Sequence, residues 1–554
     1  MKKIYNAFFT LTLALAATTL SAQTPGWEWA DASGDHGYEG ANSVAMDASG
    51  NAYLTGSYTS AFIDFGTISL LNAFSGTADV CVAKYDATGA VLWAKTYGGV
   101  AGDAGTGITV DGFGNVFVTG WFTSDTIIFG SQMLLNSASA SSDFFILKLD
   151  PSGNVVWAKS AGGSGNDRPW DVTTDASGNS YATGSYTSPT INFGTGTLTN
   201  AGPTQHDIFV VKYDANGTPQ WSKTVGGANN DAAYGCQTDA SGNIYVVGSF
   251  ASASIDFGSG ALTNVQTGFH DFCINKYDAA GNSLWSRSAN GAYDDIAYSV
   301  AVSGANVYVT GYYNSPTLQF GTNPVLSNPG NPTLDIFVAQ YSSSGVANWS
   351  NTAGGPDDDI GRCITTDALG NTYVTGYFMS TSIGFGTTTL NNCAVGTKEL
   401  YVAAFNSAGT STWSLSVGNT GDEFGYGIVS SANADMIYVG GMFNSGFVAF
   451  GANTIYKGCG DDVFLAKFGT VTSVEDGITE NDFVLFPNPT RDQVMVNLVE
   501  NSSVEMISLY DISGKFLMRE AVNSRTRIAI DLSAYERGVY QLVIGDEAVR
   551  VVKE

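Results

Sequence analysis

A tryptophan recurs every 64 residues along most of the chain, and this fixed period constrains the fold more than any other feature. Phe-Gly pairs and Gly-Asn pairs follow the same period. A period of this length indicates a repeat architecture, in which each copy is one unit packed against its neighbours. The seven tryptophans are Trp29, Trp93, Trp157, Trp221, Trp285, Trp349 and Trp413.

Each unit contains signals for β-strands only. In the copy over 107–159, apolar residues on both sides of the turn at 111–115 predict two strands joined by a tight turn. The Gly-Asn pair in that turn supplies the positive φ that such turns need. Segments 143–150 and 155–159 predict a third and a fourth strand. Four antiparallel strands repeated seven times are typical of an all-β fold, the seven-bladed β-propeller.

The phase of the repeat predicts how the ring of blades closes. Six units supply a tryptophan strand after their own third strand, whereas the seventh ends at 462–468 without one. The unpaired copy is the segment 27–30, which contains Trp29. We therefore expect this N-terminal strand to complete the last blade, which removes an exposed sheet edge.

Two motifs within the units are shared with a known family. They are Asp-x-x-Gly-Asn-x-Tyr-x-Thr-Gly at 175–184 and Asp-x-Phe-Val-x-Lys-Tyr-Asp at 207–214. In these motifs the units resemble the seven-bladed β-propeller repeat (SBBP-type) family of secreted bacterial proteins. The resemblance implies a propeller over 23–468 and no single activity, because propellers host many.

The first 22 residues have the pattern of a signal peptide. Lys2 and Lys3 precede an apolar run over 7–20, and Ser21 and Ala22 provide a small-residue cleavage site. The run is shorter than the roughly 20 apolar residues that span a bilayer, and no later segment reaches that length. We expect an exported chain that begins near Gln23 and has no transmembrane segment.

The composition changes after residue 468. Residues 469–482 are polar and predict a linker, and short apolar stretches beyond it predict a small Ig-like β-sandwich over 483–554. This region carries a set of short motifs, namely Phe486-Pro487-Asn488-Pro489, Gly538-Val539-Tyr540 and Lys553.

In these motifs the region is similar to the C-terminal sorting domain of the type IX secretion system of Bacteroidetes. The resemblance implies the type IX machinery as a partner, removal of the domain, and a product that is secreted or held on the outer-membrane surface. An ordinary Ig-like module is the alternative.

Charge excludes some classes of partner. The chain has 23 Lys and Arg against 50 Asp and Glu, a formal net charge of −27. We expect no nucleic-acid partner, because no basic surface is available to neutralise phosphates. Docking on anionic lipid through a basic patch is disfavoured for the same reason.

An acidic residue stands ten places after each tryptophan. Carboxylates suit hard cations, so calcium is the metal that a ring of them would hold; no other cofactor is predicted. The alternative is structural, with each carboxylate accepting backbone N–H bonds from a nearby loop, and sevenfold repetition favours it. The seven residues are Glu39, Asp103, Asp167, Asp231, Asp295, Asp359 and Glu423.

Three residues beyond each acid the units differ from one another. The seven positions hold Asn42, Thr106, Trp170, Tyr234, Tyr298, Arg362 and Tyr426. The last five form a candidate ligand-binding arc at the mouth of the channel, because aromatic faces stack on the apolar faces of sugars while polar groups fix orientation. The alternative is that these side chains only fill the central channel.

Cysteine and histidine offer weaker candidates. Cys393 and Cys459 fall in loops of successive units, 66 residues apart, where a disulfide is an alternative to free thiols. His206 and His270 are 64 residues apart, and they are interpreted either as solvated side chains or as ligands of a metal shared by adjacent blades.

Together these patterns favour a monomeric, non-catalytic binding or adhesion scaffold whose ligand is a glycan or surface polymer. No nucleophile elbow, Walker loop or His-Glu-x-x-His motif is present. One alternative is a secreted glycan-active enzyme that uses carboxylates at the channel mouth. Another is a purely structural component of the cell surface.

Overall fold

The computed structural model describes residues 26–469 except 203, 290, 329, 331 and 459, and residues 483–486, 490, 493–498, 506–511, 515–522, 527–544 and 547–553. The chain divides into two compact units, Met1–Thr470 and Val471–Glu554. The predicted signal peptide (1–22), and all of the predicted linker but Gly469, lie outside the described residues. Among the residues that are described, no helix is long and apolar enough to cross a membrane.

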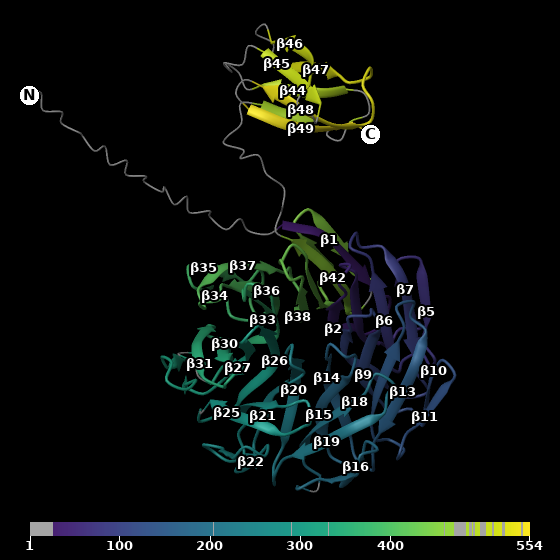
Figure 1. The fold of residues 1–554 in the computed structure, drawn as a ribbon, viewed down its shortest axis with the longest axis vertical. Helices are drawn as coiled ribbons and strands as arrows, with labels where there is room; N and C mark the ends of the chain where they lie inside the picture. Colours follow the sequence, from purple (N-terminus) through teal and green to yellow (C-terminus); the bar gives the residue numbers. More distant parts are fainter. Residues whose placement is uncertain are drawn as a thin grey trace, which may run out of the picture. The chain divides into compact units, whose positions relative to one another are not determined.

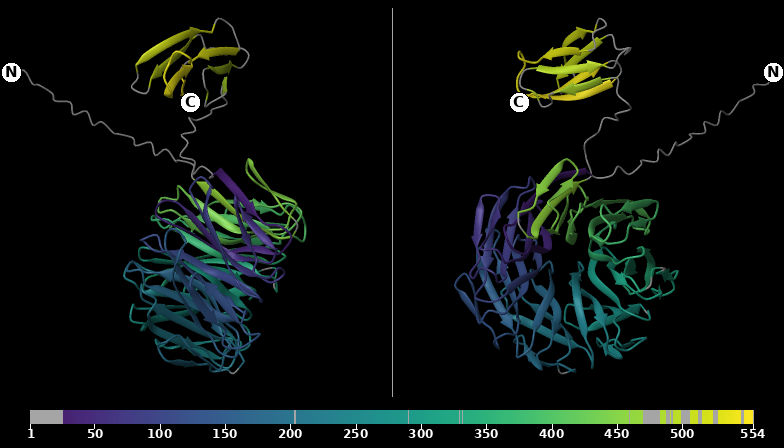
Figure 2. Two further views of the ribbon diagram at one scale, coloured as in Figure 1. Left: turned by 90° about the vertical axis from the view of Figure 1, so that its right-hand side faces the viewer. Right: turned by 180° about the vertical axis from the view of Figure 1, so that it is seen from behind.

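In the described part of the first unit, the long strands form seven four-stranded antiparallel sheets of one design (Figures 1 and 2). Six of them take their four strands from one stretch of chain, in the order first, second, third, fourth. Their strands are β2 (Glu39–Met46), β3 (Ala52–Tyr58), β6 (Asp79–Tyr85) and β7 (Val91–Tyr97); β8 (Asp103–Val110), β9 (Val116–Phe122), β12 (Asp143–Leu149) and β13 (Val155–Ala161); β14 (Asp167–Thr174), β15 (Ser180–Tyr186), β18 (Asp207–Tyr213) and β19 (Pro219–Val225); β20 (Asp231–Thr238), β21 (Ile244–Phe250), β24 (Asp271–Tyr277) and β25 (Ser283–Ala289); β26 (Asp295–Ser303), β27 (Asn306–Tyr313), β30 (Asp335–Ser342) and β31 (Ala347–Ala353); β32 (Asp359–Thr366), β33 (Thr372–Phe378), β36 (Glu399–Phe405) and β37 (Ser411–Val417).

The remaining sheet joins the two ends of the unit. It contains β38 (Glu423–Ser430), β39 (Ile437–Phe443), β42 (Asp462–Gly469) and, as its fourth strand, β1 (Gly26–Ser33). β1 pairs with β42 in antiparallel register, with Trp29 opposite Lys467, as the phase of the repeat predicts. Backbone hydrogen bonds between the first and last strands therefore hold the unit closed.

The first strands of the seven sheets are the innermost. They contact one another in cyclic order, β2, β8, β14, β20, β26, β32, β38 and again β2. The sheets consequently stand around a common centre like the blades of a propeller (Figure 1). The apolar cores lie between neighbouring sheets, as where Val210 of β18 and Val246 of β21 belong to one buried cluster.

The periodic tryptophans seal the seams between neighbouring sheets. The Trp157 indole donates a hydrogen bond of 3.2 Å to the carbonyl oxygen of Ala215 in the next sheet, and Lys148 donates to the same oxygen at 3.0 Å. A Cβ at Gly217 would lie 2.8 Å from the Trp157 ring, and Gly217 has a φ of 77°. Only glycine lets the ring approach this turn so closely at low conformational cost. The same indole-to-carbonyl bond recurs from Trp29, Trp93, Trp221, Trp285 and Trp349.

In the described part of the first unit, the chain forms a short hairpin between the second and third strands of each of the seven four-stranded sheets. These hairpins are β4 (Phe62–Phe65) with β5 (Ile68–Leu71), β10 (Thr126–Phe129) with β11 (Gln132–Leu135), β16 (Thr190–Asn192) with β17 (Thr197–Thr199), β22 (Ser254–Asp256) with β23 (Ala261–Thr263), β28 (Thr317–Leu318) with β29 (Leu326–Ser327), β34 (Ser382–Phe385) with β35 (Thr388–Asn391), and β40 (Phe447–Phe450) with β41 (Asn453–Tyr456).

The second unit contains two antiparallel sheets in its described residues. One holds β43 (Phe483–Phe486), β44 (Gln493–Leu498) and β47 (Arg527–Asp531); the other holds β45 (Met506–Asp511), β46 (Phe516–Ala521), β48 (Gly538–Ile544) and β49 (Glu547–Lys553). Val496 and Ile528 of the first sheet share one buried cluster with Leu509 and Leu542 of the second. The two sheets therefore face each other across a common core.

Candidate functional site

Every innermost strand carries a β-bulge at the same place. In β14 the register with β15 shifts between Pro169 and Asp171, which leaves Trp170 without a partner in the ladder. A bulge adds one residue to a strand and redirects its side chain. The residues left out in this way are Asn42, Thr106, Trp170, Tyr234, Tyr298, Arg362 and Tyr426. They are the seven variable positions that the sequence comparison of the units singles out.

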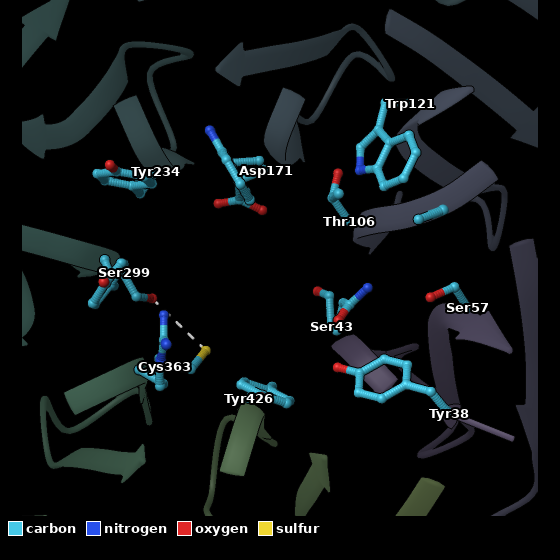
Figure 3. Close-up of a pocket in the computed structure, with 15 residues that line it drawn as sticks. Tyr38, Ser43, Ser57, Thr106, Trp121, Asp171, Tyr234, Ser299, Cys363 and Tyr426 are labelled. Atoms are coloured by element: carbon cyan, nitrogen blue, oxygen red, sulfur yellow. Dashed lines mark hydrogen bonds between the residues drawn. The ribbon is translucent and has the colours of Figure 1, made fainter. Parts of the chain in front are cut away.

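The bulge residues line a central cavity of about 590 Å³. All five residues of the predicted arc, Trp170, Tyr234, Tyr298, Arg362 and Tyr426, contribute to its wall. Figure 3 shows the labelled side chains arranged around an open centre. This volume lies within the range of roughly 300–1,000 Å³ that is usual for ligand pockets.

The five arc residues contact one another in sequence from sheet to sheet. Ring centroids are 5.7 Å apart between Trp170 and Tyr234, and 5.3 Å apart between Tyr234 and Tyr298. The Arg362 guanidinium lies 4.4 Å from the centroid of the Tyr298 ring and 5.8 Å from that of Tyr426. The arc is thus a continuous row of four aromatic rings, tilted or edge-on where they meet, with one cation between Tyr298 and Tyr426. Such a row suits both aromatic contact and charge recognition.

Asp171 lines the cavity and was missed by sequence reasoning. Its carboxylate accepts hydrogen bonds from the backbone N–H groups of Val172 and Cys236, both at 2.8 Å. Burial nevertheless raises the pKa of Asp171 to about 7. The sequence contains a pattern that could have identified Asp171. The residue directly after the bulge position is small in each of the other six units. The column reads Ser43, Gly107, Asp171, Gly235, Ser299, Cys363 and Gly427.

Two further aromatic residues line the wall. Trp121, at the sixth residue of β9, lies under the Arg168 guanidinium, which is 4.5 Å from the indole centroid. Tyr38, just before β2, is 47% exposed, and Figure 3 shows its ring at the side of the cavity. Both residues stand in columns that vary between units, which is the signal that identifies them.

The seven predicted acidic residues begin the innermost strands but do not line the cavity. Asp103 is typical: it is buried and accepts hydrogen bonds from the N–H groups of Gly99, Thr123 and Ser124 and from the Ser124 hydroxyl. The N–H groups are backbone donors from nearby loops, which is what the structural alternative to a cation site predicts. Among the described residues, no group of three or more His, Cys, Asp or Glu side chains could hold a metal ion.

Between neighbouring sheets, some of these acids lie near a second acid that begins a third strand. Burial, together with the nearby Asp143 carboxylate, raises the pKa of Asp167 to about 6. Burial, together with the Asp271 carboxylate, raises the pKa of Asp295 to about 8. In each case the second acid begins the third strand of the preceding sheet.

The weaker candidates are placed as follows. Cys393 is exposed, but Cys459 lies outside the described residues, so the disulfide stays a prediction. His206 and His270 are both partly buried. The His206 ring Nδ1 lies within hydrogen-bond distance of the Ser185 hydroxyl, and the His270 ring Nδ1 lies within hydrogen-bond distance of the Ser249 hydroxyl.

Two of the three predicted sorting motifs, Gly538-Val539-Tyr540 and Lys553, lie on paired strands of the second unit. Gly538 stands opposite Lys553 and Tyr540 opposite Val551 in the β48–β49 ladder. The Lys553 ammonium group donates to the carbonyl oxygens of Leu532 at 2.7 Å and Tyr535 at 2.8 Å. Phe486 ends β43, while Pro487, Asn488 and Pro489 lie outside the described residues.

Residues 484–554 match the family model of the secretion system C-terminal sorting domain. The sorting domain indicates handling by the type IX machinery and export to the cell surface or the surroundings. Its match covers the region that carries the sequence motifs described above.

The first unit has distant relatives. The chain is 22% identical over 444 residues to an uncharacterized WD repeat-containing protein of Acanthamoeba polyphaga mimivirus, a match that covers 65% of this chain and 32% of the relative. It is 25% identical over 396 residues to the regulatory protein FlaEY of Caulobacter vibrioides, covering 67% of this chain and 39% of the relative. The chain therefore spans less than two fifths of either relative.

Solved structures with similar repeated sheets include WD40 domains. The RRP9 WD40 repeats match at 8% identity with a TM-score of 0.44, covering 80% of this chain and 99% of that one. The Pan2 WD40 domain of Neurospora crassa matches at 9% identity with a TM-score of 0.36, covering 79% of this chain and 90% of that one.

Proposed function

We propose that residues 23–468 form a closed seven-bladed β-propeller of the SBBP type, exported as a monomeric binding scaffold. The support is the cyclic contact of the innermost strands together with the pairing of β1 and β42. The C-terminal unit is an Ig-like sorting domain of a Bacteroidetes protein, and residues 1–22 are its signal peptide. Handling by the type IX machinery delivers the propeller to the outer-membrane surface or the surroundings.

The propeller binds a saccharide of a glycan or surface polymer at its central cavity. The observation that carries this proposal is the arc from Trp170 to Tyr426, in which four aromatic rings and one guanidinium from neighbouring sheets line one cavity. Aromatic faces beside a few fixed polar groups match the apolar C–H faces and the hydroxyl groups of a sugar.

The cavity wall favours binding over glycan cleavage. Glycosidases use two carboxylates roughly 5–10 Å apart. Among the described residues that line the cavity, Asp171 is the only Asp or Glu. The alternative of a glycan-active enzyme depends on acids such as Asp103. Asp103 is buried, accepts a hydrogen bond from the Ser124 hydroxyl and does not line the cavity.

The test is a saccharide-binding measurement on the exported protein, by calorimetry and by quenching of tryptophan fluorescence. Trp170→Ala is expected to weaken binding at least about tenfold, which corresponds to about 1.4 kcal/mol. Phe74→Ala is the matched control, because Phe74 is exposed and does not line the cavity. Equal weakening by both variants, or no binding to any member of a broad glycan panel, would contradict the proposal.

A further inference from the structure

Arg362 is a positively charged side chain of the cavity wall that is surrounded by tyrosine rings. Its guanidinium is packed among the rings of Tyr298, Tyr426 and Tyr377, at 4.4, 5.8 and 5.9 Å from their centroids. Its Nε atom is buried and has no hydrogen-bond partner. Because a guanidinium keeps its charge at any pH at which proteins fold, this is a permanent cation with an unused donor.

No carboxylate of the described residues neutralises this cation. Arg362 takes part in none of their ion pairs. The acid of the cavity, Asp171, lies on β14, with β20 and β26 between it and β32 in the ring, and backbone N–H groups of Val172 and Cys236 occupy its carboxylate. Arg362 is half-buried, and the Tyr377 hydroxyl is a hydrogen-bond partner of its guanidinium. A partly desolvated charge with no opposite charge beside it favours the arrival of an anion.

The neighbours of Arg362 restrict what kind of anion fits. Tyr298 and Tyr234 lie on one side and Tyr426 on the other, so any group that reaches the guanidinium also meets aromatic faces. A bare inorganic anion would use the charge but none of these faces. The planar guanidinium matches the planar carboxylate through two parallel hydrogen bonds.

We infer that the cavity selects an acidic saccharide, a sugar ring that bears a carboxylate of the uronic-acid type. This inference rests on the proposed function and adds to it the charge of the ligand. The carboxylate pairs with Arg362, while the ring stacks along Tyr298, Tyr234 and Trp170. Since the chain carries a net charge of −27, attraction of an anion comes from this local contact rather than from the field of the whole protein.

The experiment compares matched ligands on the full chain by calorimetry. The probes are oligosaccharides of galacturonate, glucuronate and mannuronate, each paired with its methyl ester, which keeps the ring and removes the charge. At least one free acid is expected to bind at least about tenfold more tightly than its ester. Arg362→Met is expected to abolish this difference while leaving weak binding of the ester.

Arg287→Met is the matched control variant. Its guanidinium also stacks on an aromatic ring, at 5.5 Å from Trp285, but it lies on the outer strand β25 and does not line the cavity. It should retain the preference for the acid. The wild-type comparison of acid and ester needs no variant, so the inference stays testable if Arg362→Met fails to fold.

The outcomes separate the two proposals. Equal binding of every acid and its ester would overturn the inference and leave saccharide binding intact. Absence of binding by all acids and all esters would overturn both. Tighter binding of a sulfated neutral oligosaccharide than of any uronate would overturn the carboxylate assignment.

Discussion

Trp29 and Lys467 share one acceptor, the carbonyl oxygen of Ala87. The indole donates to it at 3.1 Å and the ammonium group at 3.2 Å. Trp29 comes from the N-terminal strand and Lys467 from the last strand of the first unit, whereas Ala87 lies in the turn between β6 and β7. The seam that closes the ring therefore uses the same two bonds as the seams inside the repeat, where Trp157 and Lys148 share Ala215.

A substitution in that turn should weaken the closing seam. A Cβ at Gly89 would lie 2.9 Å from the Trp29 ring, and Gly89 has a φ of 91°. Gly76 has a similar φ of 95° but nothing within 4 Å of its added Cβ. We expect Gly76→Ala to cost about 1 kcal/mol and Gly89→Ala clearly more, because only the second displaces the indole. Denaturant unfolding of both variants measures this, and equal costs would contradict the role of Trp29.

The buried acids of the seams should make the protein most stable in mild acid. Burial raises the pKa of Asp167 to about 6, of Asp359 to about 7 and of Asp295 to about 8, so the folded state keeps protons that the unfolded chain releases above about pH 4. This contribution to stability is complete below that pH and is lost as the pH rises through 6 to 8. The free energy of unfolding should therefore fall from pH 5 to pH 8 at constant ionic strength.

Asp295→Asn provides the specific check on this pH dependence. An amide does not titrate, so the variant should lose stability less steeply than the wild type between pH 5 and pH 8. Asp278→Asn is the control, because hydrogen bonds from Asn282 lower the pKa of Asp278 and the group is already ionised throughout this range. A wild-type stability that rises with pH would contradict the argument.

Binding of an acidic saccharide should depend on pH through Asp171. As the pH rises through about 7, Asp171 becomes charged and repels an anion in the same cavity, so affinity should decrease. Cys236 and Cys363, which also interact electrostatically with Asp171, have pKa values raised by burial and remain neutral thiols in this range. Titration by calorimetry from pH 6 to pH 8 measures the decrease, and Asp171→Asn should abolish it. A pH dependence that persists in the variant would assign it to another group.

Lys553 should be required for a stable sorting domain. Its ammonium group is buried and donates to the carbonyl oxygens of Leu532 and Tyr535. Lys553→Met leaves those acceptors without their donor, which costs about 1–3 kcal/mol each where no water replaces it. We expect reduced export, measured as the fraction of protein outside the cell. Arg527→Met, at an exposed strand position, is the control, and equal export of both variants would contradict this role.

The sequence predicts the residues of the arc, which the structure places at the cavity, and it predicts the surroundings of the arc less well. That the arc binds a ligand stays a prediction. Trp170 and Tyr234 could be found because the 64-residue period aligns equivalent positions, so that the variable ones stand out. That they are bulge residues could not be predicted, since a bulge depends on the register between two strands. Asp171 was not predicted for the same reason. In a regular strand, successive side chains point to opposite faces, so Trp170 and Asp171 would not share a cavity. The bulge brings both side chains to the cavity wall.

The acids illustrate the opposite case. The 64-residue spacing identifies Asp167 as one of seven equivalent acids, and the structure places it at the start of an innermost strand. The sequence does not show that Ser188 and Gly163 would donate to its carboxylate. Nor does it show that Asp143, from the preceding sheet, lies close enough to raise its pKa. The second fact arises from packing between neighbouring sheets, which a pattern within one unit cannot contain. The first depends on how the loops before β14 and after β15 fold together within one sheet.

The repeated bulge separates the part of each blade that forms the paired ladder from the part that lines the cavity. Seven positions, one per innermost strand, lie outside the paired ladder and already differ from unit to unit. None of them forms the indole-to-carbonyl bonds of the outer seams, although Asn42 donates a hydrogen bond to the Gly105 carbonyl oxygen of the next sheet. The architecture is consequently a natural platform for engineering, in which a library at these seven sites would yield new specificities on an unchanged frame.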